Sequence, residues 1–370
     1  MLTLFLILLS FIILRGLSER PESSVVVFEK GEGGYYCHKI PYLFETVTGT
    51  LVALAEARGG AGREACDDFS GTDLVIKRSD DGGQTWSPLA VLVSNSSAED
   101  VNIIGNAAPI VQRDTNRIHI PFCRNNEESW YTYSDDDGLT WAPWVLLPQA
   151  VQPDWKWVGL GPPGGLQLNS GRLLVSGYHT TKVKGDGELS RGHTLISDDL
   201  GVSWRVGAES IGGQYRVNEN QAVQLGDGSV LLNARTLTPQ RVQATSHDGG
   251  ESFPDEEVLP AVGLTETVEG CEGSLFRWSC EDDADAADVL YYSGVANDKL
   301  VRRGMWIYVS EDSGVSWRSL QTVDAGAVAY SSLASSQGDL VLLYERSDSY
   351  SLVFEPDQIV FYRVGALPLL

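Results

Sequence analysis

The chain has 370 residues, and its 27 Lys and Arg against 50 Asp and Glu give a formal net charge of −23. This acidic excess excludes broad contact with nucleic acid, because the phosphate backbone requires a basic protein surface. Apolar residues make up 42% of the chain, enough for a sizeable core and too many for a disordered protein. The 39 Gly, 10 Trp and 14 Tyr favour short strands joined by tight turns over a helical bundle.

An almost unbroken apolar run, residues 2–14, precedes Arg15 and a polar stretch. The run is shorter than the ~20 residues of a membrane-spanning helix and is typical of the apolar region of a signal peptide. No basic residue precedes it and no A-x-A pattern follows it, so a signal anchor is the alternative. We therefore expect a signal peptide or signal anchor over residues 1–18. We also expect entry into the secretory pathway, with the protein secreted, lysosomal or associated with a membrane. If the start of the chain is misassigned, the protein would be cytoplasmic.

Five cysteines are spread along the chain: Cys37, Cys66, Cys123, Cys271 and Cys280. An odd number in a chain of this length does not indicate a disulfide scaffold. The sequence leaves open one loop closed by Cys271 and Cys280, or five buried thiols. The chain has no C-x-x-C motif, and its five His show no metal-ligand spacing. We therefore predict neither a metal site nor a cofactor.

One octapeptide pattern, Ser-x-Asp-x-Gly-x-Thr/Ser-aromatic, occurs five times. It begins at Ser79, Ser134, Ser197, Ser246 and Ser310, at intervals of 55, 63, 49 and 64 residues. The pattern is that of a turn, because an Asp carboxylate can accept backbone N–H bonds and a Gly supplies a positive φ. The aromatic residue then packs the turn against its sheet. We therefore interpret these Asp residues as structural rather than catalytic.

Between the octapeptides, short apolar or alternating segments bounded by Gly, Asp or Asn predict strands. The irregular intervals favour a propeller over a linear solenoid, because propeller blades share a hairpin and differ in their loops. Divided among six blades, residues 21–370 would supply about 58 residues each, which is also the mean interval between octapeptides. The sequence thus predicts one all-β domain, a six-bladed β-propeller with five such turns. Strands from both ends of the chain would close its last blade.

The octapeptides resemble the Asp boxes of sialidases, and the segments between them resemble the exo-α-sialidase (neuraminidase) family from about residue 25 to 365. Residues 53–83 are similar to the family's E-G-R segment and acidic loop, and residues 218–235 to its Asn-Glu…Asn-Ala-Arg segment. VRRGMWIYVS resembles the surroundings of its third arginine, and AYSSL and LLYER those of its tyrosine and glutamate. The resemblance implies retaining hydrolysis of terminal α-linked sialic acids from glycoproteins, glycolipids and oligosaccharides.

The resemblance also implies a role for each reacting group. Tyr330 would be the nucleophile, Glu219 its base, and Asp68 the general acid and base, with Asp67 as the alternative. Sialidases are the tyrosine-nucleophile exception among glycosidases, and the substrate gives a reason, since its own carboxylate would repel a carboxylate nucleophile. A phenol with a pKa of about 10 needs a base within hydrogen-bonding reach. Asp73 is assigned to the strand after the acidic loop.

A pocket for the substrate carboxylate needs several cations, and guanidinium groups suit carboxylates well. The resemblance assigns Arg235 and Arg302 to this pocket. Arg58 would line it, and Glu345 would hold the first cation by an ion pair. The chain departs from the family at that cation, because the family's Arg-Ile-Pro is Lys39-Ile-Pro here. Lysine keeps the charge without the bidentate fork, a loss of about 1.5–3 kcal/mol for one charge-assisted hydrogen bond.

Lys39 leaves a second function open. A catalytically weak or inactive sialidase-like propeller would bind the same sialylated glycans as a lectin. A purely structural interaction module is disfavoured, because the acidic loop, Glu219, both arginines and Tyr330 occur in the family's order. The expected partners are therefore sialylated glycans.

Overall fold

A computed structural model describes residues 20–59, 65–94, 102–182, 189–278, 288–295, 301–348 and 354–366. The predicted signal peptide or anchor, residues 1–18, lies outside these residues. The described part is built from antiparallel strands with three short 3₁₀ turns, η1 (Glu32–Gly34), η2 (Gly213–Tyr215) and η3 (Asp255–Glu257), which confirms the all-β class. No helix in this part is long and apolar enough to cross a membrane.

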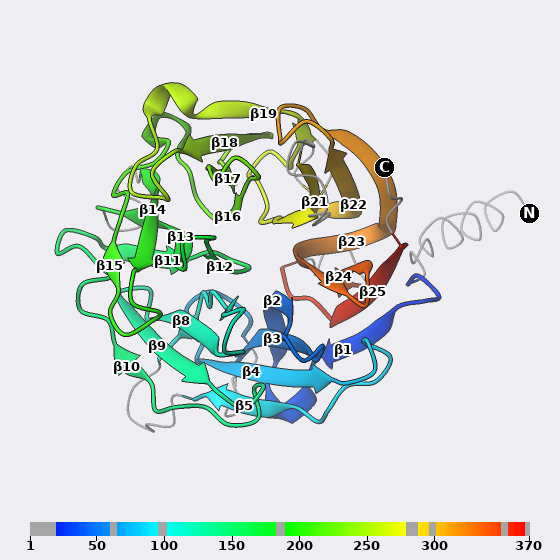
Figure 1. Cartoon of the computed structure of the whole chain (residues 1–370). Helices are drawn as coiled ribbons and strands as arrows, with labels where there is room; N and C mark the ends of the chain where they lie inside the picture. The colour runs from blue at the N-terminus through cyan, green and yellow to red at the C-terminus, as the bar shows by residue number, and fades with distance from the viewer. Residues whose placement is uncertain are drawn as a thin grey trace, which may run out of the picture.

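The strands form five hydrogen-bonded sheets arranged in a ring, a β-propeller-like fold (Figure 1). One sheet contains β2 (Cys37–Glu45), β3 (Leu51–Arg58), β4 (Thr72–Ser79) and β5 (Ala90–Val93). The next contains β6 (Ile104–Gly105), β7 (Ile110–Val111), β8 (Ile118–Arg124), β9 (Glu128–Ser134) and β10 (Val145–Leu146). The third contains β11 (Trp157–Leu160), β12 (Leu166–Gln167), β13 (Leu173–Thr180), β14 (Ser190–Ser197) and β15 (Arg205–Val206).

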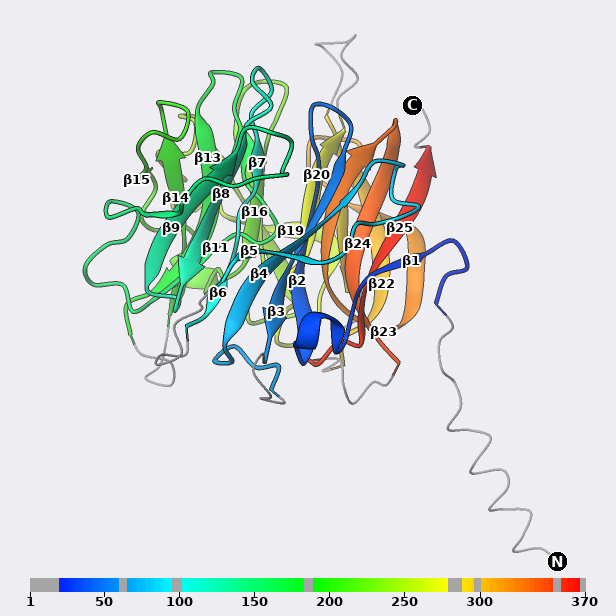
Figure 2. The same cartoon turned by 90° about the horizontal axis from the view of Figure 1, so that it is seen from below.

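The fourth sheet contains β16 (Asn220–Gln224), β17 (Val230–Ala234), β18 (Gln240–Ser246) and β19 (Leu259–Thr265). The fifth has seven strands, β20 (Ser274–Trp278), β21 (Val289–Val295), β22 (Arg303–Ser310), β23 (Arg318–Ser336), β24 (Asp339–Ser347), β25 (Gln358–Ala366) and β1 (Val25–Glu29). Because β1 pairs with β25, strands from both ends of the described chain share this sheet, as predicted. Seen edge-on, the strands run along the thickness of the ring (Figure 2).

The five octapeptides close with the same hydrogen bonds. In the second, the Ser134 hydroxyl donates to Asp136 over 2.8 Å and accepts the Gly138 N–H over 2.9 Å. Asp136 also accepts the backbone N–H of Thr140 over 2.8 Å and its hydroxyl over 2.5 Å. The same four contacts recur in the turns that begin at Ser79, Ser197, Ser246 and Ser310. The carboxylates are thus bonded within their own turns, which supports a structural role.

We expect Asp136→Ala to lower the free energy of unfolding by about 1 kcal/mol, because the exposed turn loses hydrogen bonds that solvent already weakens. The bonds from Thr140 hold the pKa of Asp136 below its usual value, so the stabilising contribution is present above the pKa of an unfolded Asp and lost in acid. Urea unfolding of Asp136→Ala beside Asp114→Ala, which changes an exposed loop aspartate, measures the effect. A large rise in KM with unchanged stability would contradict the structural interpretation.

A buried stack of aromatic side chains joins Trp155, just before β11, to two histidines of the third sheet, His179 and His193. The Trp155 ring stacks on His179 with 3.9 Å between centroids and 8° between planes. The Nδ1 atoms of His179 and His193 lie 3.4 Å apart. Burial lowers the pKa of His179 to about 4. Burial and the neighbouring His179 hold the pKa of His193 well below its usual value. Both imidazoles are therefore neutral in the folded protein at neutral pH.

These histidines predict acid sensitivity. In the unfolded chain both histidines take up a proton at a pH near 6.5. In the folded chain His179 takes up its proton only near pH 4. The free energy of unfolding therefore falls as the pH drops from about 6.5 to about 4. The loss is at most about 1.4 kcal/mol per pH unit for each proton. His179→Phe keeps a ring against Trp155, and its urea-unfolding free energies at pH 7, 6 and 5 should fall less steeply than those of the parent chain. Equal slopes would show that His179 does not titrate in this range.

Candidate functional site

The ends of one hairpin hold the first pair of predicted site residues. Glu219 precedes β16 and Arg235 follows β17, and the Arg235 N–H donates to the Glu219 carbonyl over 2.8 Å. Their separation of 16 residues is therefore the length of this hairpin. The Arg235 Nη1 atom lies 2.6 Å from Glu219 Oε2 and 3.1 Å from the Tyr330 hydroxyl oxygen. The two ends of the hairpin thus place one carboxylate and one guanidinium beside the Tyr330 hydroxyl.

Tyr330 comes from β23, and its hydroxyl donates a hydrogen bond to Glu219 Oε1. The pairing of β23 with β24 is irregular between Val328 and Ser331, so the tyrosine lies on a bulge that re-aims its side chain. Burial, and secondly the negative charge of Glu219, hold the pKa of Tyr330 well above 10. The phenol therefore stays protonated, and Glu219 is placed to take its proton.

Two carboxylates hold the backbone of this bulge. The Tyr330 N–H faces Glu345 Oε2 at 3.5 Å, and the Ser331 N–H donates to Glu272 Oε2 over 2.7 Å. Glu272 is 2% exposed, and its Oε1 atom has no hydrogen-bond partner among the described residues. Burial raises the pKa of Glu272 well above its usual value. Glu272 was not predicted from the sequence, since it contacts the bulge 59 residues away through backbone geometry alone.

Lys39 and Arg302 lie on two sides of this centre. Ile40 has a φ of +53°, rare for a β-branched residue, and the pairing of β2 with β3 is irregular between Lys39 and Tyr42. Lys39 Nζ makes no hydrogen bond or ion pair with any described residue, and burial lowers its pKa. The Arg302 guanidinium carbon lies 5.4 Å from the centre of the Tyr330 ring. Arg302 also donates to the Gly270 carbonyl over 3.4 Å.

The prediction that Glu345 forms an ion pair with Lys39 is wrong. Glu345 Oε1 accepts the backbone N–H of Ile40 over 2.8 Å, and no ion pair joins Glu345 to Lys39 within the described residues. The irregular backbone at Ile40 leaves an N–H outside the ladder, and this buried donor needs an acceptor. Glu345 therefore links the bulge of β2 to that of β23 through backbone N–H groups.

The acidic loop follows β3 and places Asp68 at the mouth of the site. Arg58 Nη1 donates to Asp68 Oδ1 over 2.9 Å and to the Cys66 carbonyl over 3.3 Å. The other edge of the Arg58 guanidinium binds buried Glu56, with distances of 2.6 and 3.1 Å. Asp67 instead accepts the Phe69 N–H over 2.8 Å and the Ser70 hydroxyl over 3.2 Å, which makes it the first residue of a turn. Asp73 lies in β4, as predicted.

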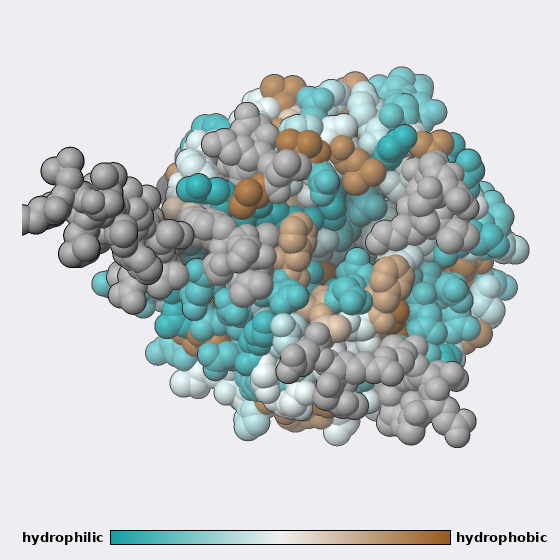
Figure 3. Space-filling model, turned by 180° about the vertical axis from the view of Figure 1, so that it is seen from behind, coloured by the Kyte–Doolittle hydropathy of each residue, from teal (hydrophilic) through white to brown (hydrophobic). Residues whose placement is uncertain are grey.

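A cavity of about 330 Å³ collects most of these side chains. Of the predicted site residues, the cavity is lined by Lys39, Arg58, Asp68, Glu219, Arg235 and Tyr330. Arg302 contacts the Tyr330 ring and Glu345 faces the Tyr330 N–H, and neither is among the residues that line the cavity. The start of β2 and the end of β3 lie toward the lower edge of Figure 2, and Figure 3 shows that face of the ring, with hydrophilic and hydrophobic residues around its hollowed centre.

Sequence reasoning missed several residues of the cavity wall: Glu56, Asn106, Asn126, Tyr178 and Asn218. Glu56 could have been found, because it is two residues before Arg58 and therefore on the same face of a strand. Trp157 also lines the cavity. Its Nε1 donates to the Tyr178 hydroxyl over 3.3 Å.

The cysteines also differ from both expectations. Cys37 and Cys66 form a disulfide, with 5.9 Å between their Cα atoms, and Cys123 and Cys271 are free and buried. The interpretation as five thiols is therefore wrong, and so is a loop closed through Cys271. Cys280 lies outside the described residues. Residues 37 and 66 are brought together only by the β2–β3 hairpin and the fold of the loop after it, which spacing does not reveal.

The chain is similar to known proteins over most of its length. A family model described as a BNR repeat-like domain matches residues 49–342. Sialidase-4 of Mus musculus is 31% identical over 253 residues, 61% of this chain and 51% of that protein. A sialidase of Micromonospora viridifaciens is 28% identical over 344 residues, 85% of this chain and 50% of that protein. The chain thus spans about half the length of these relatives.

The fold has solved counterparts. The structure of the Hadza microbial sialidase Hz136 matches with a TM-score of 0.78 and 24% sequence identity, covering 92% of this chain and 68% of that one. The two proteins thus share a fold over nearly the whole of this chain.

Proposed function

The chain belongs to the BNR-repeat sialidase family, and we propose that it is a retaining exo-α-sialidase acting on terminal α-linked sialic acids of glycoproteins, glycolipids and oligosaccharides. One observation carries the proposal: the Tyr330 hydroxyl is hydrogen-bonded to Glu219 at the wall of a cavity that also holds Asp68. A buried phenol with a carboxylate base is the arrangement of an activated nucleophile. A lectin would need the cations of this cavity but not the tyrosine–glutamate contact.

In the first step the cations of Lys39, Arg235 and Arg302 attract the substrate carboxylate. The Tyr330 oxygen bonds to the anomeric carbon as its proton passes to Glu219. The bond from that carbon to the leaving oxygen breaks, and Asp68 supplies the proton that the leaving alcohol needs. The product of this step is a sialic acid covalently attached to Tyr330.

In the second step Asp68, now ionised, takes a proton from a water molecule that attacks the same carbon. The bond to Tyr330 breaks, and the phenol recovers its proton from Glu219. Two displacements on one carbon restore the original configuration. The free acid therefore leaves as the α anomer, and all three side chains return to their starting protonation states.

The finer architecture is also an inference. We infer six blades, in which the seven-stranded sheet counts as two blades joined by β23. In support, residues 318–327 of β23 pair with β22, whereas residues 327–336 pair with β24. The hydrogen bonds of the five octapeptide turns support their assignment as Asp boxes. The boundaries of the propeller domain, residues 21–370, stay a prediction.

We propose a secretory-pathway location, because disulfides persist in oxidising compartments and Cys37–Cys66 is one. An uncleaved N-terminal apolar segment would add proximity to a membrane. Detection of the chain in the culture medium or in a membrane fraction of expressing cells tests this. Recovery in the cytosol, with Cys37 and Cys66 reduced, would contradict it.

Proton NMR of 3′-sialyllactose mixed with the purified chain tests the function. We expect the signals of α-sialic acid to appear first and those of the β anomer to follow by mutarotation. First appearance of the β anomer would contradict retention. Binding of the sugar without its cleavage would establish the lectin instead, and neither binding nor cleavage would contradict both functions.

A further inference from the structure

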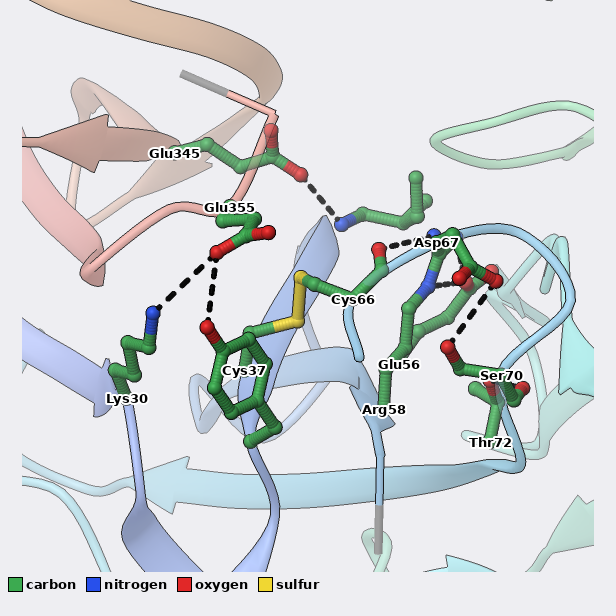
Figure 4. The surroundings of a disulfide bond; sticks show 12 residues. Lys30, Cys37, Glu56, Arg58, Cys66, Asp67, Ser70, Thr72, Glu345 and Glu355 are labelled. Carbon is green, nitrogen blue, oxygen red and sulfur yellow. Dashed lines mark hydrogen bonds and ion pairs between the residues drawn. A yellow bond between two sulfur atoms is a disulfide. The ribbon is translucent and has the colours of Figure 1, made fainter. Parts of the chain in front are cut away.

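The Cys37–Cys66 disulfide joins two chain segments that each carry residues of the cavity wall, Lys39 on one and Asp68 on the other. Cys37 begins β2 two residues before Lys39, and Cys66 lies two residues before Asp68. Figure 4 shows the bond between the two sulfur atoms. In the β2–β3 ladder Cys37 stands opposite Arg58. The guanidinium of that arginine holds both the Cys66 carbonyl and the Asp68 carboxylate. The disulfide, Arg58 and Asp68 therefore form one connected unit.

The position of Asp68 depends on its backbone. Its side chain is 53% exposed, so packing alone does not hold the carboxylate in place. On the C-terminal side the chain is anchored at Thr72, whose N–H donates to the Asn102 carbonyl over 3.1 Å. On the N-terminal side Cys66 is anchored by its bond to Cys37. Only residues 67–71 lie between the disulfide and β4, and Asp67 closes them into a turn with Ser70 over 3.2 Å.

We propose that Cys37–Cys66 is a positioning disulfide for general acid catalysis by Asp68; the inference rests on the function proposed above. Cys37 is 0% and Cys66 4% exposed, so the bond is sheltered from solvent and is suited to a structural role. Without it, Asp68 moves relative to the leaving oxygen while the nucleophile on β23 keeps its place. A misplacement of about 1 Å can cost about 100-fold in rate, and a positioned acid contributes about 10²–10⁴-fold.

A merely stabilising disulfide predicts a different kinetic pattern. Protonation by Asp68 matters when the leaving group is an alkyl alcohol, as in 3′-sialyllactose, because an alkoxide is a poor leaving group. It matters little for 4-nitrophenyl sialoside, since the phenolate leaves without a proton. Loss of positioning therefore lowers kcat/KM selectively for the first substrate. Loss of general stability lowers the active fraction and affects both substrates equally.

The double variant Cys37→Ala/Cys66→Ala is compared on both substrates with the parent chain, with Asp68→Ala, and with Asp136→Ala as a stability control. We expect kcat/KM of the double variant to fall about 10- to 100-fold on 3′-sialyllactose and less than about threefold on the aryl sialoside. Asp68→Ala should show the same selectivity, and Asp136→Ala should show none. Equal losses on the two substrates, or no loss, would overturn the inference.

If the double variant does not fold, the parent chain is incubated with dithiothreitol, which takes up the oxidising equivalents by forming its own cyclic disulfide and leaves two cysteine thiols. Thiol alkylation and mass spectrometry establish the reduced fraction, and near-UV circular dichroism establishes that the fold is kept. The reduced chain should show the same substrate selectivity, and unchanged kinetics would overturn the inference. A parent chain inactive on both substrates would instead refute the proposed function.

Discussion

Tyr330→Phe is expected to lower kcat for sialic acid release by about 10³-fold or more, the scale on which loss of a covalent nucleophile acts. The reason is local: phenylalanine keeps the ring on the bulge of β23 and removes only the oxygen that contacts Glu219 and Arg235. Glu219→Gln should cost a comparable factor, because the phenol cannot ionise without that base. The double variant should be little worse than either single one, since the two residues act as a unit.

The matched control is Tyr178→Phe. Tyr178 lines the same cavity and its hydroxyl is bonded to Trp157, but it has no base at hydrogen-bonding distance among the described residues. We expect less than about a tenfold loss of kcat/KM, the size of one neutral hydrogen bond. A fluorinated sialosyl probe, which slows hydrolysis of the covalent intermediate, should label Tyr330 in the parent chain. Labelling of another residue, or full activity of Tyr330→Phe, would refute the assignment of the nucleophile.

Lys39→Ala is expected to raise KM and lower kcat/KM about 100-fold, because the substrate carboxylate loses one of three cations. Lys39→Arg should instead raise kcat/KM about tenfold, since a guanidinium offers a bidentate fork where the ammonium offers a point charge. Both variants are measured on one sialoside. The gain of the arginine would be smaller if Ile40 and Glu345, which shape the backbone beside it, leave no room for the larger head group. A Lys39→Ala variant as active as the parent would place Lys39 outside carboxylate binding.

The same series predicts a difference in pH dependence. Burial lowers the pKa of Lys39, and the positive charges of Arg58 and Arg302 lower it further against the opposing carboxylates of Glu345 and Asp68. The lysine therefore loses its charge at a lower pH than an exposed lysine does, and KM of the parent chain should rise as the pH increases through that value. Arginine stays charged, so Lys39→Arg should lack this rise. Parallel KM profiles of the two forms would contradict the assignment.

Local chemistry could be predicted from the sequence. The octapeptide turns are closed by hydrogen bonds that span four residues or fewer, so their pattern alone indicated the structural role of the Asp residues. Glu219 and Arg235 were both named from the sequence, and their contact belongs to the two ends of one hairpin. The all-β class followed from the strand pattern for the same reason. In each case the interacting groups are neighbours along the chain, and composition and spacing describe neighbours directly.

The different contacts of the two acidic-loop carboxylates became visible only in the structure. Asp67 and Asp68 are adjacent in sequence, yet the turn uses the oxygens of one and leaves the other at the cavity. The role of Glu345 changed because its partner is a backbone N–H exposed by an irregular strand, which residue types do not show.

The contacts that build the candidate site join residues that are distant along the chain. Tyr330 and Glu219 are 111 residues apart, and Glu345 reaches Ile40 across 305. The sequence by itself determined which groups this protein carries and the turns that repeat along it. Only the tertiary structure decided which of those groups meet, and that Cys37 joins Cys66, because closing the ring brings separate sheets together at one centre while their sequence spacing carries no information on distance.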